Sequence, residues 1–326
     1  MAHAICDEKF YAYRTPAWHQ LGLVDERHHS AAELGDMLGL PEVYEQPIVV
    51  KYAGVYMPVH AWKAIVGVSP GRRAEVYAVV GSEYEIVTHT DFARLFDRAT
   101  GSRVETMGLL GKGETLFLTA PMSTIDVKGD EVHNFLLMLN PLNGRWAVRS
   151  KVTSVRVVCM NTLMVSLGEA TEHELRLTHN RRGMARMIED WVAQLWRETT
   201  GMTEMLKEAY GALATLSLIP DQVSEALEVV YPTPDDPEPN ADAHIVARIE
   251  KERLLAQAHQ SAVLELFEGS KTRTPATIGT AWGLYNACIE FEDFGKARAS
   301  KRSVVFGAGA ARKERMFAHL YTLTRT

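Results

Sequence analysis

Apolar and polar residues alternate with period two along Asn143–Leu163, NGRWAVRSKVTSVRVVCMNTL. Successive side chains of a strand point to opposite faces, so the pattern predicts a strand with one buried face and one face that presents cations to water. Asn143-Gly144 at its start is a hairpin signal, because a tight turn of that type needs positive φ. The apolar positions are Trp146, Val148 and Val152, and the cationic positions are Arg145, Arg149 and Lys151.

Two strand-rich blocks, each followed by a helix, fill residues 44–168. The first block, over 44–87, is rich in Val, Ile and Tyr and leads to a helix over Thr90–Ala99, with Thr90 or Asp91 near its start. The second block, over 104–159, leads to a short helix that Asn161 caps. We therefore expect two rounds of mostly antiparallel strands, each closed by a helix.

Helical patterns precede and follow these blocks. Ser30–Leu40 begins with a capping box of Ser30 and Glu33. After residue 183 the apolar residues recur at helical spacing, first over 184–196 and later over 241–267. Gly-containing VVFGAGAARKE, over 304–314, is expected to be a loop that leads into a last helix.

These patterns predict an α+β fold with an antiparallel, hairpin-rich sheet core and a helical C-terminal half. The expected segments are an N-terminal docking segment over 1–43, an α+β core over 44–183, a helical region over 184–231, an acidic proline-rich linker over 232–240 and a helical region with a basic tail over 241–326.

Composition places the chain among globular proteins. Hydrophobic residues make up 46% and charged residues 23% of 326, which allows one large or two medium domains. No apolar run approaches the roughly 20 residues that span a bilayer, and the first residues lack the pattern of a signal peptide. Three widely spaced cysteines suit a reducing cytoplasm, so we expect a cytoplasmic protein.

The net charge of −6 hides acidic and basic blocks. Residues 220–252 hold nine acidic and two basic groups, whereas 145–186 hold eight basic groups against three glutamates and 296–326 hold eight against one. Two interpretations stay open. The blocks pair with each other, within one chain or between copies, or the basic blocks form an anion-binding surface.

Several segments in a fixed order resemble a known family. They include PAWHQLG at Pro16–Gly22, VRVVCMNTL at Val155–Leu163, GTAWGLYNA at Gly279–Ala287 and FGAGAARK at Phe306–Lys313. Together they resemble the phage/plasmid-like protein family catalogued as domain of unknown function 932, over nearly the whole chain. Where that family has a His-Asp-Gly turn, this chain has Leu142-Asn143-Gly144. The resemblance implies an origin in a bacteriophage or plasmid and carries no mechanism with it.

No catalytic or metal-binding motif stands out, and no cofactor is expected. The Gly-x-Gly segment near Lys313 lacks the full phosphate-binding patterns, although contact with a nucleic-acid backbone suits its cations. The histidines lack ligand partners at the spacing of a zinc site. Cys159 in an apolar strand is favoured as core over nucleophile.

We therefore expect a DNA-binding protein that binds or anneals single strands during recombination or replication. By analogy with annealing recombinases, we also expect it to form homo-oligomers, which include a ring as one form. Phosphates would bind the cations by counterion release, with Tyr84 and Trp62 as candidate base-stacking residues.

One alternative is a Mg²⁺-dependent enzyme that acts on nucleic acid or nucleotides, which would use the acidic groups Glu105, Asp126, Asp130 and Glu131. Another is an inhibitor of a host defence protein. The expected nucleic-acid-binding set is Arg145, Arg149, Lys151, Arg156, Arg181, Arg182, Arg312 and Lys313.

Overall fold

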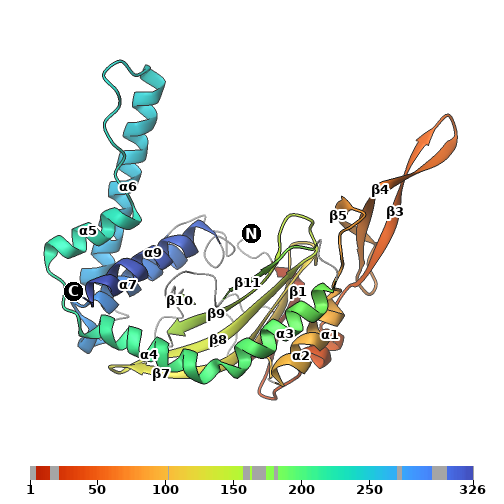
Figure 1. Cartoon of the computed structure of the whole chain (residues 1–326), viewed down its shortest axis with the longest axis horizontal. Coiled ribbons are helices and arrows are strands. Elements are labelled where there is room, and N and C mark those ends of the chain that lie inside the picture. Colours follow the sequence, from red (N-terminus) through yellow and green to blue (C-terminus); the bar gives the residue numbers. More distant parts are fainter. Residues whose placement is uncertain are drawn as a thin grey trace. The chain divides into compact units, whose positions relative to one another are not determined.

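The computed structural model describes residues 5–14, 22–101, 103–156, 162–163, 174–179, 183–269, 274–295 and 307–325. Strands dominate the first half of the chain and helices the second, so the α+β class predicted from sequence is confirmed (Figure 1). The chain forms two compact units that interleave in sequence, whereas the predicted segments follow one another. Unit 1 comprises 1–122, 135–152 and 171–199, and unit 2 comprises 123–134, 153–170 and 200–326.

The large sheet has eight strands in the order β10-β9-β8-β7-β6-β1-β2, with β11 also paired to β9. Pairing is antiparallel between β1 and β6, between β6 and β7, and between β9 and both β10 and β11, while β1 and β2 run parallel. The strands are β1 Ile5–Tyr13, β2 Leu23–Asp25, β6 Thr106–Leu110, β7 Thr115–Val127, β8 Asp130–Pro141, β9 Val148–Arg156, β10 Thr162–Leu163 and β11 Glu174–Leu177. Strand β10 lies where the sequence predicted the start of a helix, so that prediction is wrong at these two residues. The other residues of that predicted helix lie outside the described part.

Three helices cover one face of this sheet in unit 1: α1 Ala31–Met37, α2 His89–Thr100 and α3 Met184–Arg197 (Figure 1). The capping box of Ser30 and Glu33 is present as predicted. Helix α2 begins at His89, one residue earlier than expected, and Thr88, rather than Thr90 or Asp91, accepts the capping hydrogen bond. Asp97 joins α2 to α1 by accepting hydrogen bonds from the first two backbone N–H groups of α1, at 2.8 and 2.9 Å.

A second sheet of three antiparallel strands, which we call the arm sheet, consists of β3 Glu42–Tyr52, β4 Val55–Val68 and β5 Glu75–Gly81. The turn between β3 and β4 has positive φ at Ala53 and Gly54, as a two-residue hairpin requires. One face of the arm sheet packs Ile65 and Val80 against Leu142. The β3–β4 hairpin continues well beyond the end of β5 (Figure 1).

Unit 2 holds most of the remaining helices, and their core is aromatic. The rings of Tyr210 and Trp282 lie 4.8 Å apart, and Trp282 Nε1 donates a hydrogen bond to the buried Asp130 at 2.8 Å. Residues 232–240 are not helical, as expected of the proline-rich linker. Among the described residues, no helix is both long and apolar enough to cross a membrane. The elements are α4 Thr199–Thr215, α5 Pro220–Val230, α6 Ala243–Gly269, η1 Pro275–Thr277, α7 Ala281–Glu290, the π-helix η2 Phe291–Gly295 and α9 Ala308–Leu323.

Candidate nucleic-acid interface

The edge of the large sheet formed by β9 and β11 carries the predicted row of cations. Alternation along β9 is as predicted, since Val148 is fully buried while Arg149 is half-buried. The antiparallel register sets Arg176 of β11 directly opposite Arg149. Directly opposite residues of two strands share a face, so the two arginine side chains leave this ribbon on the same face. Arg176 is exposed.

Lys151 does not face water as the sequence predicted. It is only 7% exposed, and the register sets Glu174 opposite it. A buried ammonium group cannot meet a phosphate without moving, so we remove Lys151 from the predicted binding set. The alternation that identified it is correct, but alternation alone does not tell which sheet face other parts of the chain cover.

Arg145 is exposed but lies in a turn and not on the strand, which begins only at Val148. The side chain of Asn143 accepts hydrogen bonds from the backbone N–H groups of Arg145 and Trp146 at 3.0 and 3.2 Å. This Asx turn holds the chain away from an extended conformation. The turn also adjoins the base of the arm sheet, because a Cβ on Gly144 would lie 2.8 Å from Val80.

One face of strands β6 and β7 carries threonine and phenylalanine side chains. Thr106 and Thr119 are in register on β6 and β7, and their hydroxyl oxygens lie 2.7 Å apart. Phe117 has the same parity as Thr119 and is half-buried, whereas Leu118 between them is fully buried.

Phe135 of β8 shares the face of Arg149. Asn134 and Ser154 are hydrogen-bonded through their side chains, so the even-numbered residues of β8 and β9 share a face. The odd-numbered Phe135 and Arg149 therefore share the opposite face. We call this surface of unit 1 the arginine face, and its members are Phe135, Arg149 and Arg176.

Lys313 in unit 2 forms a buried ion pair and is not part of a phosphate-binding loop. Helix α9 already begins at Ala308, so Lys313 lies on its second turn and not in the expected loop. Its Nζ donates to Asp293 at 2.8 Å, with the two side chains 0% and 6% exposed. The prediction that Lys313 binds nucleic acid is contradicted by this burial.

Arg312 is likewise engaged by the protein itself. Its Nη1 donates to the buried Glu292 at 3.4 Å, and its guanidinium lies 5.9 Å from the ring centroid of Tyr231. Tyr231 also donates to Glu292 at 2.8 Å, and burial in this cluster raises the pKa of the tyrosine. Arg312 therefore has a structural role that the sequence did not indicate, and we remove it from the predicted set.

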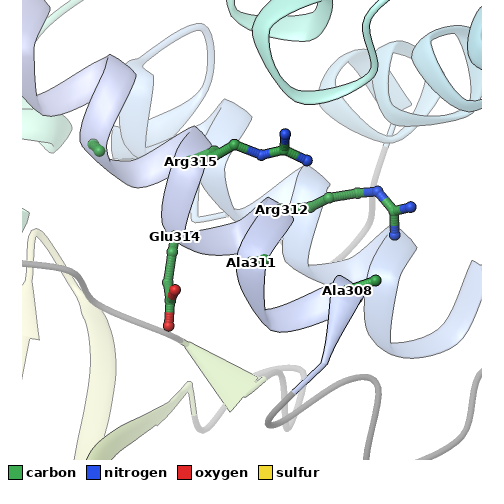
Figure 2. A pocket seen from close by; sticks show the side chains of 6 residues that line it. Ala308, Ala311, Arg312, Glu314 and Arg315 are labelled. Atoms are coloured by element: carbon green, nitrogen blue, oxygen red, sulfur yellow. The ribbon is translucent and has the colours of Figure 1, made fainter. Parts of the chain in front are cut away.

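An open hollow of about 480 Å³ runs along α9. Arg312 and Arg315 point to the same side of the helix, and Glu314 points to another side (Figure 2). Arg315 donates to the carbonyl of Val230 at 3.4 Å, so both arginines of this hollow already have partners. Its lining residues are Ala308, Ala311, Arg312, Glu314, Arg315 and Ala318.

Two of the remaining predictions concern possible stacking residues. Tyr84 stacks on His179 with ring centroids 4.6 Å apart and packs against Ile65 and Leu142, so it is a core residue and not a base-stacking one. Burial accordingly raises the pKa of Tyr84 and lowers that of His179. Trp62 is 52% exposed on the arm sheet.

Arg156 ends strand β9, but its side chain lies outside the described part of the structure, as do Arg181 and Arg182. Cys159 also lies outside it. Among the described residues, no group of three or more His, Cys, Asp or Glu side chains is arranged to hold a metal ion. Of the acidic groups considered for a magnesium site, Asp130 accepts the hydrogen bond of Trp282 and Asp126 closes a turn by accepting from Gly129 N.

Sequence reasoning did not assign Arg176 and Phe135 to the site. A signal existed for Arg176, because Glu174–Leu177 alternates polar and apolar residues in the manner of a strand. Its pairing with Arg149 depends on long-range register, which one sequence does not reveal.

A model of the family described as "Domain of unknown function (DUF932)" matches residues 76–316, about three quarters of the chain. No curated protein and no solved structure matches the chain.

Proposed function

We propose that this chain, which belongs to the DUF932 family, binds single-stranded DNA on the arginine face. The observation that carries the proposal is the pairing of Arg149 and Arg176 in register on adjacent strands. Two arginines in register provide two planar sets of donors on one face, and a phosphodiester offers two oxygens to such donors.

The third member of the arginine face suits a nucleic acid with exposed bases. Phe135 offers an aromatic ring, and base–aromatic stacking is worth about 1–3 kcal/mol per base. Bases of a duplex are already stacked and shielded, so this combination favours a single strand.

Arg145 extends the cationic surface toward the arm sheet. It is exposed on the turn that immediately precedes β9, on the same edge of unit 1 as Arg149. The proposed set is therefore Arg145, Arg149 and Arg176, which differs from the set expected from sequence. The resemblance to phage and plasmid proteins suggests strand annealing during recombination or replication as the setting.

The test is binding of a fluorescent single-stranded oligonucleotide, followed by anisotropy at several salt concentrations. The variant Arg149→Glu/Arg176→Glu should weaken binding and lower the salt slope, log K against log[salt], by about 1 to 2. Arg248→Glu/Lys251→Glu is the matched control, because both residues are exposed cations on α6 of the other unit and the charge changes by the same amount. An unchanged slope in the double variant, or an equal loss in the control, would refute the proposal.

A further inference from the structure

Exposed apolar side chains are concentrated on the arm sheet. Ten of the 22 large hydrophobic residues exposed in the described structure belong to its three strands. They are Tyr44, Val49, Val50, Tyr52, Val55, Tyr56, Met57, Trp62, Val76 and Val79. Single exposed apolar residues need no explanation, but contiguous groups of this kind mark interaction surfaces.

The two faces of the arm sheet differ in a way that shows where the partner binds. The inner face packs Ile65 and Val80 into unit 1 and carries the ion pair of Lys63 with Glu45 at 2.8 Å. The outer face has the opposite parity, and the register sets Tyr44 opposite Val66 and Ala64 opposite Val79 on this face. Between Tyr44 and the tip, the part of the outer face where the three strands pair contains no Lys, Arg, Asp or Glu. Its residues are Tyr44, Gln46, Trp62, Ala64, Val66, Val76 and Val79.

The tip of the hairpin continues this apolar character. Val50 pairs with Met57 and Tyr52 pairs with Val55, so these four residues share one face of the tip. Tyr52 is 73% exposed, and the other three are exposed as well. Lys51, the one charged residue of the segment 46–59, lies on the opposite face of the tip, with its Nζ 5.4 Å from the ring centroid of Tyr56.

Two prolines weaken the arm sheet as a template for strand addition at β3 and at the tip. Pro47 interrupts the edge strand β3, and Pro58 interrupts β4 in the part that extends beyond its pairing with β5. Proline has no N–H to donate to a new strand, and natural sheets use it to prevent edge-to-edge association. Contact through the outer face is therefore favoured over addition of a strand beside β3.

We propose that the outer face of the arm sheet binds the same face of a second copy of this chain. A two-fold contact brings the same surface of two copies together. A charged group near its centre would then lie close to the same charge of the other copy, so an uncharged surface is required. The outer face meets this requirement from Tyr44 toward the tip, and its acidic residue, Glu42, lies at the opposite end of β3, where its carboxylate accepts a hydrogen bond from Tyr44. A single-stranded polyanion would need cations on this face, which its residues do not provide.

The size of the surface agrees with a stable pair. Val49 and Tyr56 pair with Pro58 and Lys51 on the other face of the tip, so eight of the ten residues remain for this surface. At roughly 100 Å² for each side chain, these eight expose about 800 Å². Each partner of a stable interface covers about 800 Å². Because a two-fold contact closes at two copies, any larger ring would need a second interface. This inference does not depend on DNA binding by the arginine face.

Sedimentation equilibrium of the full chain tests the proposal. The wild type should show twice the mass of one chain at micromolar concentration, and Trp62→Glu and Val79→Glu should each raise the dissociation constant by about a hundredfold. Both positions are exposed in the single chain, so circular dichroism should show unchanged folding. Leu254→Glu, at an exposed leucine of α6, is the control and should leave the mass unchanged.

A mixing experiment tests the symmetry. Tagged Trp62→Glu should fail to pair with wild type, because a two-fold contact uses the same surface on both copies. Recovery of the mixed pair would contradict the two-fold contact. A wild type that stays monomeric at all concentrations would overturn the proposal. If such a monomer bound oligonucleotides or phosphatidylcholine vesicles through Trp62, the face would belong to that partner instead.

Discussion

Replacing His89 by glutamine should change how the stability of unit 1 depends on pH. His89 is the first residue of α2 and is fully buried. Its Nε2–H donates to the carbonyl of Gly113 at 2.9 Å, and its Nδ1 lies 3.4 Å from the amide nitrogen of Asn140. A proton on Nδ1 would therefore point at another donor. Burial lowers the pKa of His89 from 6.5 to about 4, against a smaller opposing effect of the Gly113 hydrogen bond.

The magnitude follows from this lowered pKa. Between pH 6.5 and 4 the unfolded chain binds a proton at His89 that the folded chain does not bind. The free energy of unfolding therefore falls by up to about 1.4 kcal/mol per pH unit over this range, and by about 3 kcal/mol in total. Above pH 6.5 the imidazole is neutral in both states and has no effect on the pH dependence.

Glutamine is the informative replacement because its amide can donate to Gly113 and accept from Asn140 without titrating. His89→Gln should be less stable than wild type at pH 7.5 by about 1–3 kcal/mol, owing to imperfect hydrogen bonds. This deficit should shrink as the pH falls toward 4, since only the wild type loses stability through His89.

Hydrogen exchange of the α2 amides in increasing urea, at pH values from 7.5 to 4.5, reports the stability of this unit. Effects of other groups, such as His179, occur in both proteins and cancel in the difference. His60→Gln, at an exposed histidine on the arm sheet, should behave as wild type. If the wild type and His89→Gln lose stability in parallel on acidification, the assigned burial and hydrogen bonds of His89 are wrong.

Two further predictions concern unit 2. Lys313→Met should lower the free energy of unfolding by about 3–5 kcal/mol, because it leaves Asp293 charged and buried. In urea titrations, Lys313→Met/Asp293→Asn should recover most of this loss of stability. A mild effect of the single variant, with loss of DNA binding, would restore Lys313 to the binding surface. Trp282→Phe should cost about 2 kcal/mol by removing the donor to Asp130. In an Asp130→Ala background the same change should cost clearly less, and equal costs in both backgrounds would show that the hydrogen bond contributes nothing.

A structural feature was predicted correctly where the residues that determine it lie close together in the sequence. The capping box at Ser30, the arm strands broken at Gly54 and the non-helical linker were all predicted, because each depends on residues within a few positions of one another. The predicted parity of β9 was correct for the same reason. The turn at Arg145 was missed because the side chain of Asn143 competes with strand formation.

The candidate site was predicted only in part. Arg149 remains part of the proposed surface, and Arg176 is added to it. Lys151, Arg312 and Lys313 were predicted to bind nucleic acid but are not part of it. Asp293 precedes Lys313 by 20 residues, and nothing in the local pattern distinguishes a lysine that is paired from one that is exposed.

By itself, the amino-acid sequence determined the kinds of elements, their order and the α+β class, since hydrophobic periodicity and capping act within a strand or a turn of helix. The tertiary structure decided which cations face water, which strands pair in register and which apolar face stays uncovered. Those outcomes depend on contacts between residues far apart in the chain. Burial is a property of the assembled fold, and the same arginine or valine is equally compatible with a covered or an open face until its neighbours are in place.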